Sequence, residues 1–139
     1  MRLTRFTDYS LRVLIYLGQN HQRRVTIHQI SEEYDISKNH LMKVVSNLTR
    51  MELVVAQRGP GGGISLNRLP KDIGLNEVIS ITEKHLPEPT AVNSFVPSDD
   101  NADDRLSDYL QHALHSYLHT LSQFTLADVL NTNPVTEEI

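Results

Sequence analysis

Four polar side chains at the predicted start of one helix offer the clearest chemistry in this 139-residue sequence. Lys38, Asn39, His40 and Lys43 follow Ser37, a residue type that commonly caps helix N-termini. Lysine binds phosphate or guanine, asparagine can bridge the edge of adenine, and histidine can donate to either. Ser37 and the free N–H groups at the helix start can also hold a phosphate. The group predicts a contact with duplex DNA, and a solvated polar helix face is the alternative.

A glycine-rich stretch, RGPGGG at residues 58–63, offers a second contact. It lacks the Gly-Lys-Ser/Thr ending of a phosphate-binding loop, and no helix pattern follows it. A hairpin tip is the better interpretation, because glycines let the backbone approach DNA and an arginine can enter a minor groove or pair with a phosphate. The residues expected to contact DNA from this tip are Arg58, Gly59, Gly61 and Gly62.

A stripe of metal-capable side chains lies further along the chain. Asp108, His112, His115 and His119 share one face of a predicted helix, so they are weak candidates for a metal site. A straight stripe supplies at most two or three ligands to one ion. The stripe also lies opposite a leucine face, which favours the ordinary polar side of an amphipathic helix. No metal site is therefore expected here.

Composition excludes several classes of protein. The sequence has no cysteine, and therefore neither a disulfide nor a thiolate ligand for zinc or an iron–sulfur cluster. No apolar run approaches 18 residues and no signal-peptide pattern opens the chain, so a cytoplasmic protein is expected. There is no nucleophile-elbow pattern and no HExxH, so an enzyme is not expected.

Charge is distributed unevenly along the chain. Residues 1–68 hold ten Lys/Arg and five Asp/Glu, whereas residues 69–139 hold three and twelve. A net charge of +5 on the front half and −9 on the back half favours a polyanion partner for the front half, and uneven surface charge without a partner is the alternative. Three further residues that could contact the DNA backbone are Arg2, Arg5 and Arg12.

The elements that would position these residues begin with three helices of one design, in which an apolar residue precedes a Thr or Ser cap. The predicted caps are Thr7, Thr26 and Ser37, and Thr26 forms a capping box with Gln29. Two residues separate the second helix from the third, as in a helix-turn-helix. Short strands at 53–57 and 64–66 follow. This order predicts a mainly α winged helix-turn-helix.

The back half is expected to mediate assembly. A fourth helix is predicted to start near Asn76, a long amphipathic helix covers 103–124, and a short helix covers 125–130. The wide apolar stripe of the long helix needs a partner, for which the same helix of a second subunit is a good candidate. We expect DNA binding in residues 1–84, a connecting loop in 85–102, and dimerisation in 103–139.

Several of these motifs resemble one family of bacterial regulators. LTRFTDYSLRVLIYL, ISKNHLMKVVSNL, RGPGGGISL and TLADVL occur in the order typical of the Rrf-two family, and are most similar to its nitric-oxide-sensing repressors. The resemblance implies a dimeric winged-helix transcription factor that binds a pseudo-palindromic promoter site. It also implies that residues 37–51 read the major groove, that the wing at 58–63 reaches the minor groove, and that residues 103–124 dimerise.

The resemblance does not extend to the cofactor of the cluster-binding members. Those members carry three cysteines before the dimerisation helix, near the positions of Ser94, Ser98 and Asp104 in this chain. In some relatives an aspartate matching Asp8 is a further ligand, from the partner subunit. Serine is a very poor ligand for iron–sulfur clusters, so no cofactor is expected.

The sequence leaves three interpretations of the loop that precedes the long helix. It is a ligand-free linker in a homodimeric repressor, which we favour; or it binds a hard cation; or its serines are introduced replacements for cysteines. The cation ligands would be Asp99, Asp100, Asp103 and Asp104. For the whole chain, the alternatives to a repressor are a metal-responsive regulator, using this loop or the histidine stripe, and a protein-interaction module that has lost DNA binding.

Overall fold

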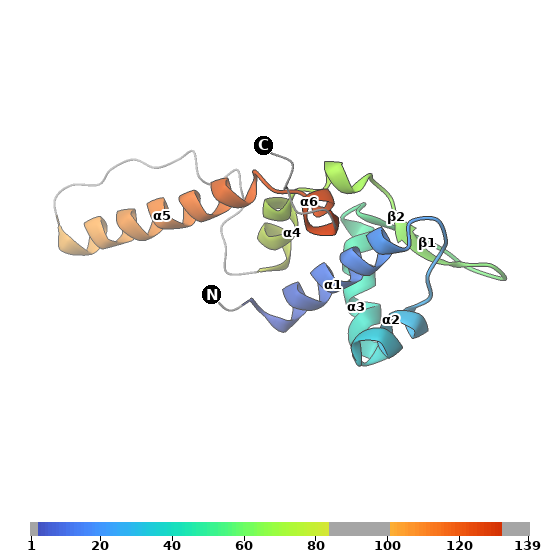
Figure 1. Ribbon diagram of the computed structural model, residues 1–139. Coiled ribbons are helices and arrows are strands. Elements are labelled where there is room, and N and C mark those ends of the chain that lie inside the picture. The colour runs from blue at the N-terminus through green and yellow to red at the C-terminus, as the bar shows by residue number, and fades with distance from the viewer. Residues whose placement is uncertain (1–2, 84–100, 132–139) are drawn as a thin grey trace, which may run out of the picture.

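The computed structural model describes residues 3–83 and 101–131, and shows a winged helix from which one long helix extends (Figure 1). Among the helices described, none combines the length and apolar character needed to cross a membrane. The elements are, in chain order, α1 (Arg5–Gln19), α2 (Ile27–Tyr34), α3 (Lys38–Arg50), β1 (Val54–Gln57), β2 (Gly63–Leu66), the 3-10 helix η1 (Pro70–Asp72), α4 (Leu75–Thr82), α5 (Ala102–Leu121) and α6 (Leu126–Leu130).

The helix-turn-helix forms where its local capping signals predict it. The Thr26 hydroxyl accepts from the backbone N–H of Gln29, and the Gln29 side chain accepts from that of Thr26, which confirms the capping box. Asp35 turns the chain in the left-handed region, at φ 53°. The Ser37 hydroxyl then accepts from the N–H of His40 at 3.2 Å and starts α3, as expected. These caps fix the direction in which α3 leaves the turn.

The cap predicted for the first helix is wrong. Thr4, one turn earlier, is the N-cap of α1 and accepts from the backbone N–H of Thr7. Thr7 is buried inside the helix, and its hydroxyl donates to that of Thr82 in α4 at 2.8 Å. The backbone N–H of Thr4 also donates to the Glu83 carboxylate at 2.8 Å. Contacts with α4, about 75 residues away in sequence, therefore decide the start of this helix.

The other boundaries differ slightly from the predicted ones. α4 begins at Leu75, one residue before the predicted start. α5 ends at Leu121, whereas the prediction extended to Phe124. The carbonyl of Phe124 accepts from the N–H of Leu75 at 3.0 Å, which draws this segment out of the helix and onto the start of α4. The predicted tail after Pro134 lies outside the described residues.

The wing is a two-stranded antiparallel hairpin that projects from the helices (Figure 1). Val54 pairs with Leu66 and Gln57 pairs with Gly63. Gly59 and Gly61 at its tip have positive φ values of 93° and 74°, which residues with a Cβ adopt only with strain. At its base, Val25 exchanges backbone hydrogen bonds with Ile64, so the segment before α2 is joined to the wing.

One apolar core holds the helices, the wing base and the C-terminal α6 together. Leu126 in α6 is 1% exposed, and its backbone N–H donates to the carbonyl of Ile73 at 2.9 Å. α6 packs so closely on α1 that a Cβ on Gly18 would lie 2.3 Å from Leu130 Cδ1. The core residues are Val13, Leu14, Leu17, Val25, Ile30, Ile36, Leu41, Val44, Val45, Leu48, Leu53, Val54, Ile64, Ile73, Val78 and Leu126.

This packing predicts that α6 stabilises the winged helix. Leu126→Ala removes a fully buried side chain and should lower the free energy of unfolding by about 3 kcal/mol. Val129→Ala in the same short helix is the matched control, because Val129 is 47% exposed. Urea denaturation followed by circular dichroism measures both. Equal effects of the two substitutions would contradict the docking of α6 in the core.

Candidate nucleic-acid interface

The N-terminal part of α3 is exposed together with the polar group predicted from the sequence. Lys38, Asn39, His40 and Lys43 are all solvent-exposed. The ring of His40 lies 6.0 Å from that of Tyr9 in α1, tilted by 42°, so α1 restrains this histidine. Neither lysine forms an ion pair in the described part of the chain. The group lies at a free helix end and can approach a partner.

The charge of α3 suits a polyanion. The helix contains Lys38, Lys43 and Arg50 and no acidic residue. Its N-terminus adds the partial positive charge of the helix dipole at the same end as Lys38. Arg50 donates to the side chain of Asn47 one turn earlier, which orients it along the helix surface. No carboxylate on α3 therefore competes with a phosphate for these cations.

The wing residues predicted from the sequence fall into two groups. Arg58, Gly59 and Gly61 are exposed, and a Cβ at either glycine would meet open space. Gly62 is half-buried, and a Cβ there would lie 2.3 Å from the carbonyl oxygen of Gln57. The hairpin can therefore close only with glycine at position 62. At Gly59 and Gly61 there is room for a side chain, so the hairpin tip presents exposed backbone.

Arg24, which the sequence analysis did not single out, lies beside the wing. Its Nη1 donates to the carbonyl oxygen of Gly61 at 3.4 Å, and Arg23 next to it is exposed. Both belong to the short connection between α1 and α2. The Arg-Arg pair was visible in the sequence, but only the backbone pairing of Val25 with Ile64 brings it to the wing. Arg24 therefore adds a cation beside the wing tip.

An open cavity of about 800 Å³ lies beside α3, on the side that faces the start of α1 and the end of α4. Met42 and Ile81 are exposed apolar side chains at this cavity. Its lining thus combines apolar groups with two cations of α3. The lining residues are Thr4, Phe6, Met42, Lys43, Ser46, Asn47, Arg50, Ile81 and Thr82.

Asp8, the residue that matches a cluster ligand of some relatives, is engaged within its own helix. Its Oδ2 accepts from Arg12 Nε at 3.1 Å. The Arg12 guanidinium also stands 5.6 Å from the ring centre of Tyr34, and burial raises the pKa of that tyrosine. Arg12 therefore contacts α2 and Asp8 together.

The remaining metal-capable side chains are spread along α5. Within residues 3–83 and 101–131, no three His, Asp or Glu side chains are grouped to hold a metal ion. His112, His115 and His119 are exposed and Asp108 is half-buried. Asp103 and Asp104 lie in the first turn of α5, where carboxylates stabilise a helix, and Asn101 caps that turn. The other predicted loop residues, Ser94, Ser98, Asp99 and Asp100, lie outside the described residues.

A winged helix whose second motif helix is exposed, basic and free of carboxylates defines a DNA-binding regulator. The Rrf2 (Rrf-two) family model, described as "Iron-dependent Transcriptional regulator", matches residues 3–132. The chain belongs to the Rrf2 family of transcriptional regulators, which confirms the resemblance seen in the sequence. It matches the HTH-type transcriptional regulator NsrR of Bacillus licheniformis at 41% identity over 135 residues, covering 94% of this chain and 92% of the relative.

Other known proteins agree with this assignment. NsrR of Bacillus subtilis is 41% identical over 135 residues, covering 94% of this chain and 90% of that protein. The structure of T. potens IscR has a TM-score of 0.71 at 24% identity, covering 94% of this chain and 86% of that one. The structure of CymR (YrzC) of B. subtilis has a TM-score of 0.71 at 22% identity, covering 96% and 99%. These two structures support the winged-helix fold.

The residues of this chain do not fit an iron–sulfur cluster, although the family description refers to iron. Such clusters are held by cysteine thiolates, and the sequence has no cysteine. Asp8 forms an ion pair with Arg12. Asp104 supplies a carboxylate, which suits hard cations and not a sulfide cluster. The residues of this sequence therefore cannot hold an iron–sulfur cluster through thiolates.

The role of Gly62 yields a prediction. Gly62→Ala places a Cβ against the backbone oxygen of Gln57, which cannot move without opening the hairpin. We expect the wing to deform and DNA affinity to fall about tenfold, the effect of one lost set of groove contacts. Pro60→Ala at the exposed tip is the control and should bind like the unaltered chain. Fluorescence anisotropy with a labelled duplex measures both, and an unaffected Gly62→Ala variant would contradict this role.

Proposed function

We propose that this chain is a homodimeric, sequence-specific repressor that binds a pseudo-palindromic promoter site without an iron–sulfur cluster. The observation that carries the proposal is the exposed, carboxylate-free start of α3 beside an exposed wing in a member of the Rrf2 family. It would act in the cytoplasm, where the DNA lies, and not as an enzyme. Repression is inferred from the similarity to NsrR regulators.

The arrangement supports a division of labour between α3 and the wing. Lys38 and Lys43 would bind phosphates, while Asn39 and His40 would reach base edges in the major groove. Arg58 at the wing would enter or border the adjacent minor groove. Phosphate contacts would supply most of the affinity and base contacts the selectivity. Arg24 beside the wing would add one more phosphate contact.

Dimerisation through α5 is supported by the apolar surface that this helix leaves in water. Leu106, Tyr109 and Leu110 are 57%, 68% and 61% exposed, and they lie on neighbouring turns. Toward its end Leu118 is buried, and α5 packs on α4 there. In Figure 1 the first turns of α5 extend far from the winged helix. A second copy of α5 would cover this surface and place two α3 helices at half-sites about 34 Å apart.

Binding to bulk genomic DNA at low and high salt tests the proposed function directly. A DNA-binding regulator should associate strongly at low salt and weakly at high salt. Selection of bound genomic fragments, followed by sequencing, would then identify the operator. A chain that ignores duplex DNA even at low salt would instead be the protein-interaction module considered above. The comparisons favour neither that alternative nor a metal-responsive regulator.

The role of Lys43 can be separated from that of Asn39. Lys43→Ala should weaken binding to all sequences and reduce the slope of log affinity against log salt by about one. Asn39→Ala should leave the slope unchanged and relax base preference at one position in each half-site. Anisotropy titrations across a salt series and a randomised-site selection measure the two effects. An unchanged slope for Lys43→Ala would show that this side chain touches no phosphate.

The proposed dimer surface is tested by placing a charge in it. Leu110→Asp should yield monomers, because an unpaired carboxylate would be buried between the two helices. His112→Asp is the matched control, since His112 lies on the opposite side of α5 and is exposed. Analytical ultracentrifugation measures the mass of each variant. A Leu110→Asp variant that stays dimeric would place the subunit contact elsewhere.

A further inference from the structure

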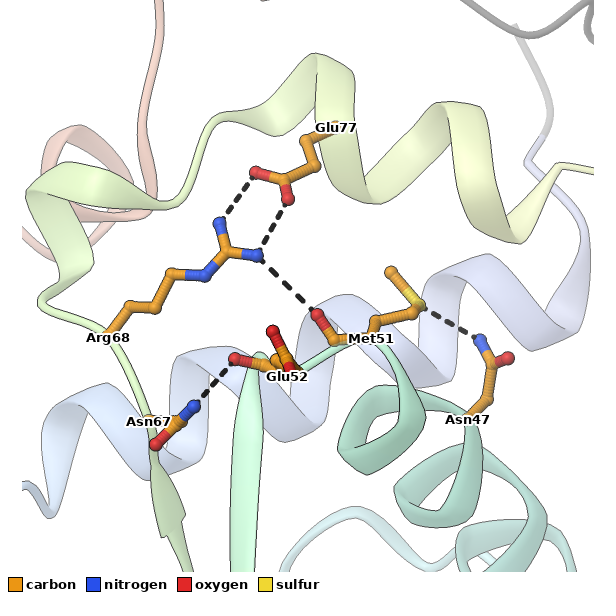
Figure 2. Close-up of polar contacts among 6 residues, drawn as sticks. All are labelled: Asn47, Met51, Glu52, Asn67, Arg68 and Glu77. Atoms are coloured by element: carbon orange, nitrogen blue, oxygen red, sulfur yellow. Dashed lines mark hydrogen bonds and ion pairs between the residues drawn. The ribbon is translucent and has the colours of Figure 1, made fainter.

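Side chains from just beyond the wing bind the turn that follows the C-terminal end of α3. Met51 caps this helix, and Glu52 follows with a left-handed φ of 61°. The backbone N–H groups of Glu52 and Leu53 donate to the carbonyl oxygens of Thr49 and Leu48, which leaves the carbonyl groups of the turn itself to other donors. Asn67 Nδ2 donates to the carbonyl oxygen of Glu52 at 3.0 Å, and Arg68 Nη2 donates to that of Met51 at 3.5 Å (Figure 2). The segment after β2 is thereby attached to the end of α3.

Arg68 is bound at the same time to the first turn of α4. Its Nη1 donates to Glu77 Oε2 at 3.0 Å, and its Nη2 lies 2.9 Å from Glu77 Oε1, as Figure 2 shows. A cation suits the negative C-terminal end of α3, and a carboxylate suits the N-terminal turn of α4. The hydrogen bond with Glu77 raises the pKa of Arg68. One guanidinium therefore joins α3 and α4 at the point where the wing returns.

The Arg68–Glu77 pair is partly exposed, so its contribution to folding stability differs from its effect on the orientation of the elements it joins. The Arg68 and Glu77 side chains are 33% and 34% exposed, and ion pairs that water reaches contribute little to folding stability. One hydrogen bond and one close ion-pair contact between two planar groups nevertheless restrict their relative orientation. The pair is thus better suited to holding three elements at fixed angles than to holding the fold together.

The other end of α4 is held separately. Thr82 accepts from the Thr7 hydroxyl at 2.8 Å, and the Glu83 carboxylate accepts from the N–H of Thr4. These contacts attach α4 to α1 and keep it in place when the Arg68 contact is removed. α4 can therefore act as a fixed support, against which Arg68 sets the position of the wing base and of the α3 end.

We propose that Arg68 is a positioning residue for DNA binding, which fixes the angle between the wing and α3 by contacting Met51 and Glu77 together. This inference rests on the proposed function, because the angle decides whether the helix start and the wing tip reach adjacent grooves in one complex. Arg68 itself touches no phosphate in this role. Its loss lowers affinity for the operator and leaves the salt slope unchanged.

The binding test uses the full chain and the operator recovered by genomic selection. Arg68→Gln should weaken operator binding about tenfold, as for one misplaced base contact, with an unchanged salt slope. Lys71→Gln removes the same charge from an exposed side chain of η1 and is the matched control. Glu77→Gln should reproduce the loss, and the double variant should be no worse than Arg68→Gln alone. Equal effects of Arg68→Gln and Lys71→Gln, or a reduced salt slope, would overturn the proposal.

A distance measurement tests the same inference without DNA. Because the chain has no cysteine, Thr49→Cys on α3 and Pro60→Cys at the wing tip, both exposed positions, provide a clean pair of spin-label sites. Labelled chain is diluted with unlabelled chain so that each dimer carries one labelled subunit. Pulsed electron resonance should show a broader distance distribution in Arg68→Gln and Glu77→Gln than in Lys71→Gln.

The two measurements distinguish failure of this inference from failure of the proposed function. An unaltered chain that binds no DNA would refute the proposed function, and the distance distribution would still decide the role of Arg68. A distribution in Arg68→Gln that matches the unaltered chain would overturn the positioning role whatever the DNA result. Circular dichroism checks that each variant is folded, and Glu77→Gln replaces Arg68→Gln if the latter is not.

Discussion

One side of α3 is attached to the core by the buried side chains of Leu41, Val44 and Leu48. This attachment decides which side chains of the helix remain exposed. A 13-residue helix is barely stable in water by itself, so its position must come from tertiary packing. The buried side leaves the opposite side free to carry lysine, asparagine and arginine without any carboxylate. The same apolar core takes in the base of the wing through Ile64. Burial on one side and basic exposure on the other are thus two consequences of a single packing arrangement.

Elements with local signals could be predicted from the sequence, and those set by distant contacts could not. Thr26 and Ser37 act as caps because their partners lie three residues away. Thr4 and Thr7 are both suitable caps for α1, and the choice falls on Thr4 because Thr7 bonds to Thr82. Among the residues proposed to contact DNA, those at the start of α3 and at the wing tip could be predicted from the sequence. The contribution of Arg24 depends on a strand pairing of Val25 that no short-range pattern indicates.

The chemistry of this family member follows from the donor atoms that it has. The family is described as iron-dependent, and this sequence has no thiolate to hold a cluster. Asp8 forms an ion pair with Arg12, which in turn lies over Tyr34 in α2. A residue that could face a cofactor is thereby used to join α1 to the helix-turn-helix. A cluster held by cysteine thiolates of this chain is therefore not available to it as a sensor.

Because α6 returns to the core, the C-terminal end of the long helix α5 is held close to the winged helix. Leu126 and Leu130 fasten the chain to α1 and η1 only a few residues after α5 ends, so little slack remains at that junction. A helix of 20 residues is roughly 30 Å long, so a tilt of about 5° displaces its far end by about 2.6 Å. In the proposed dimer, a slight shift between the two α5 helices would in turn move each winged helix as a whole. The distance between the two winged helices would then depend on the angle at which each α5 leaves its own winged helix.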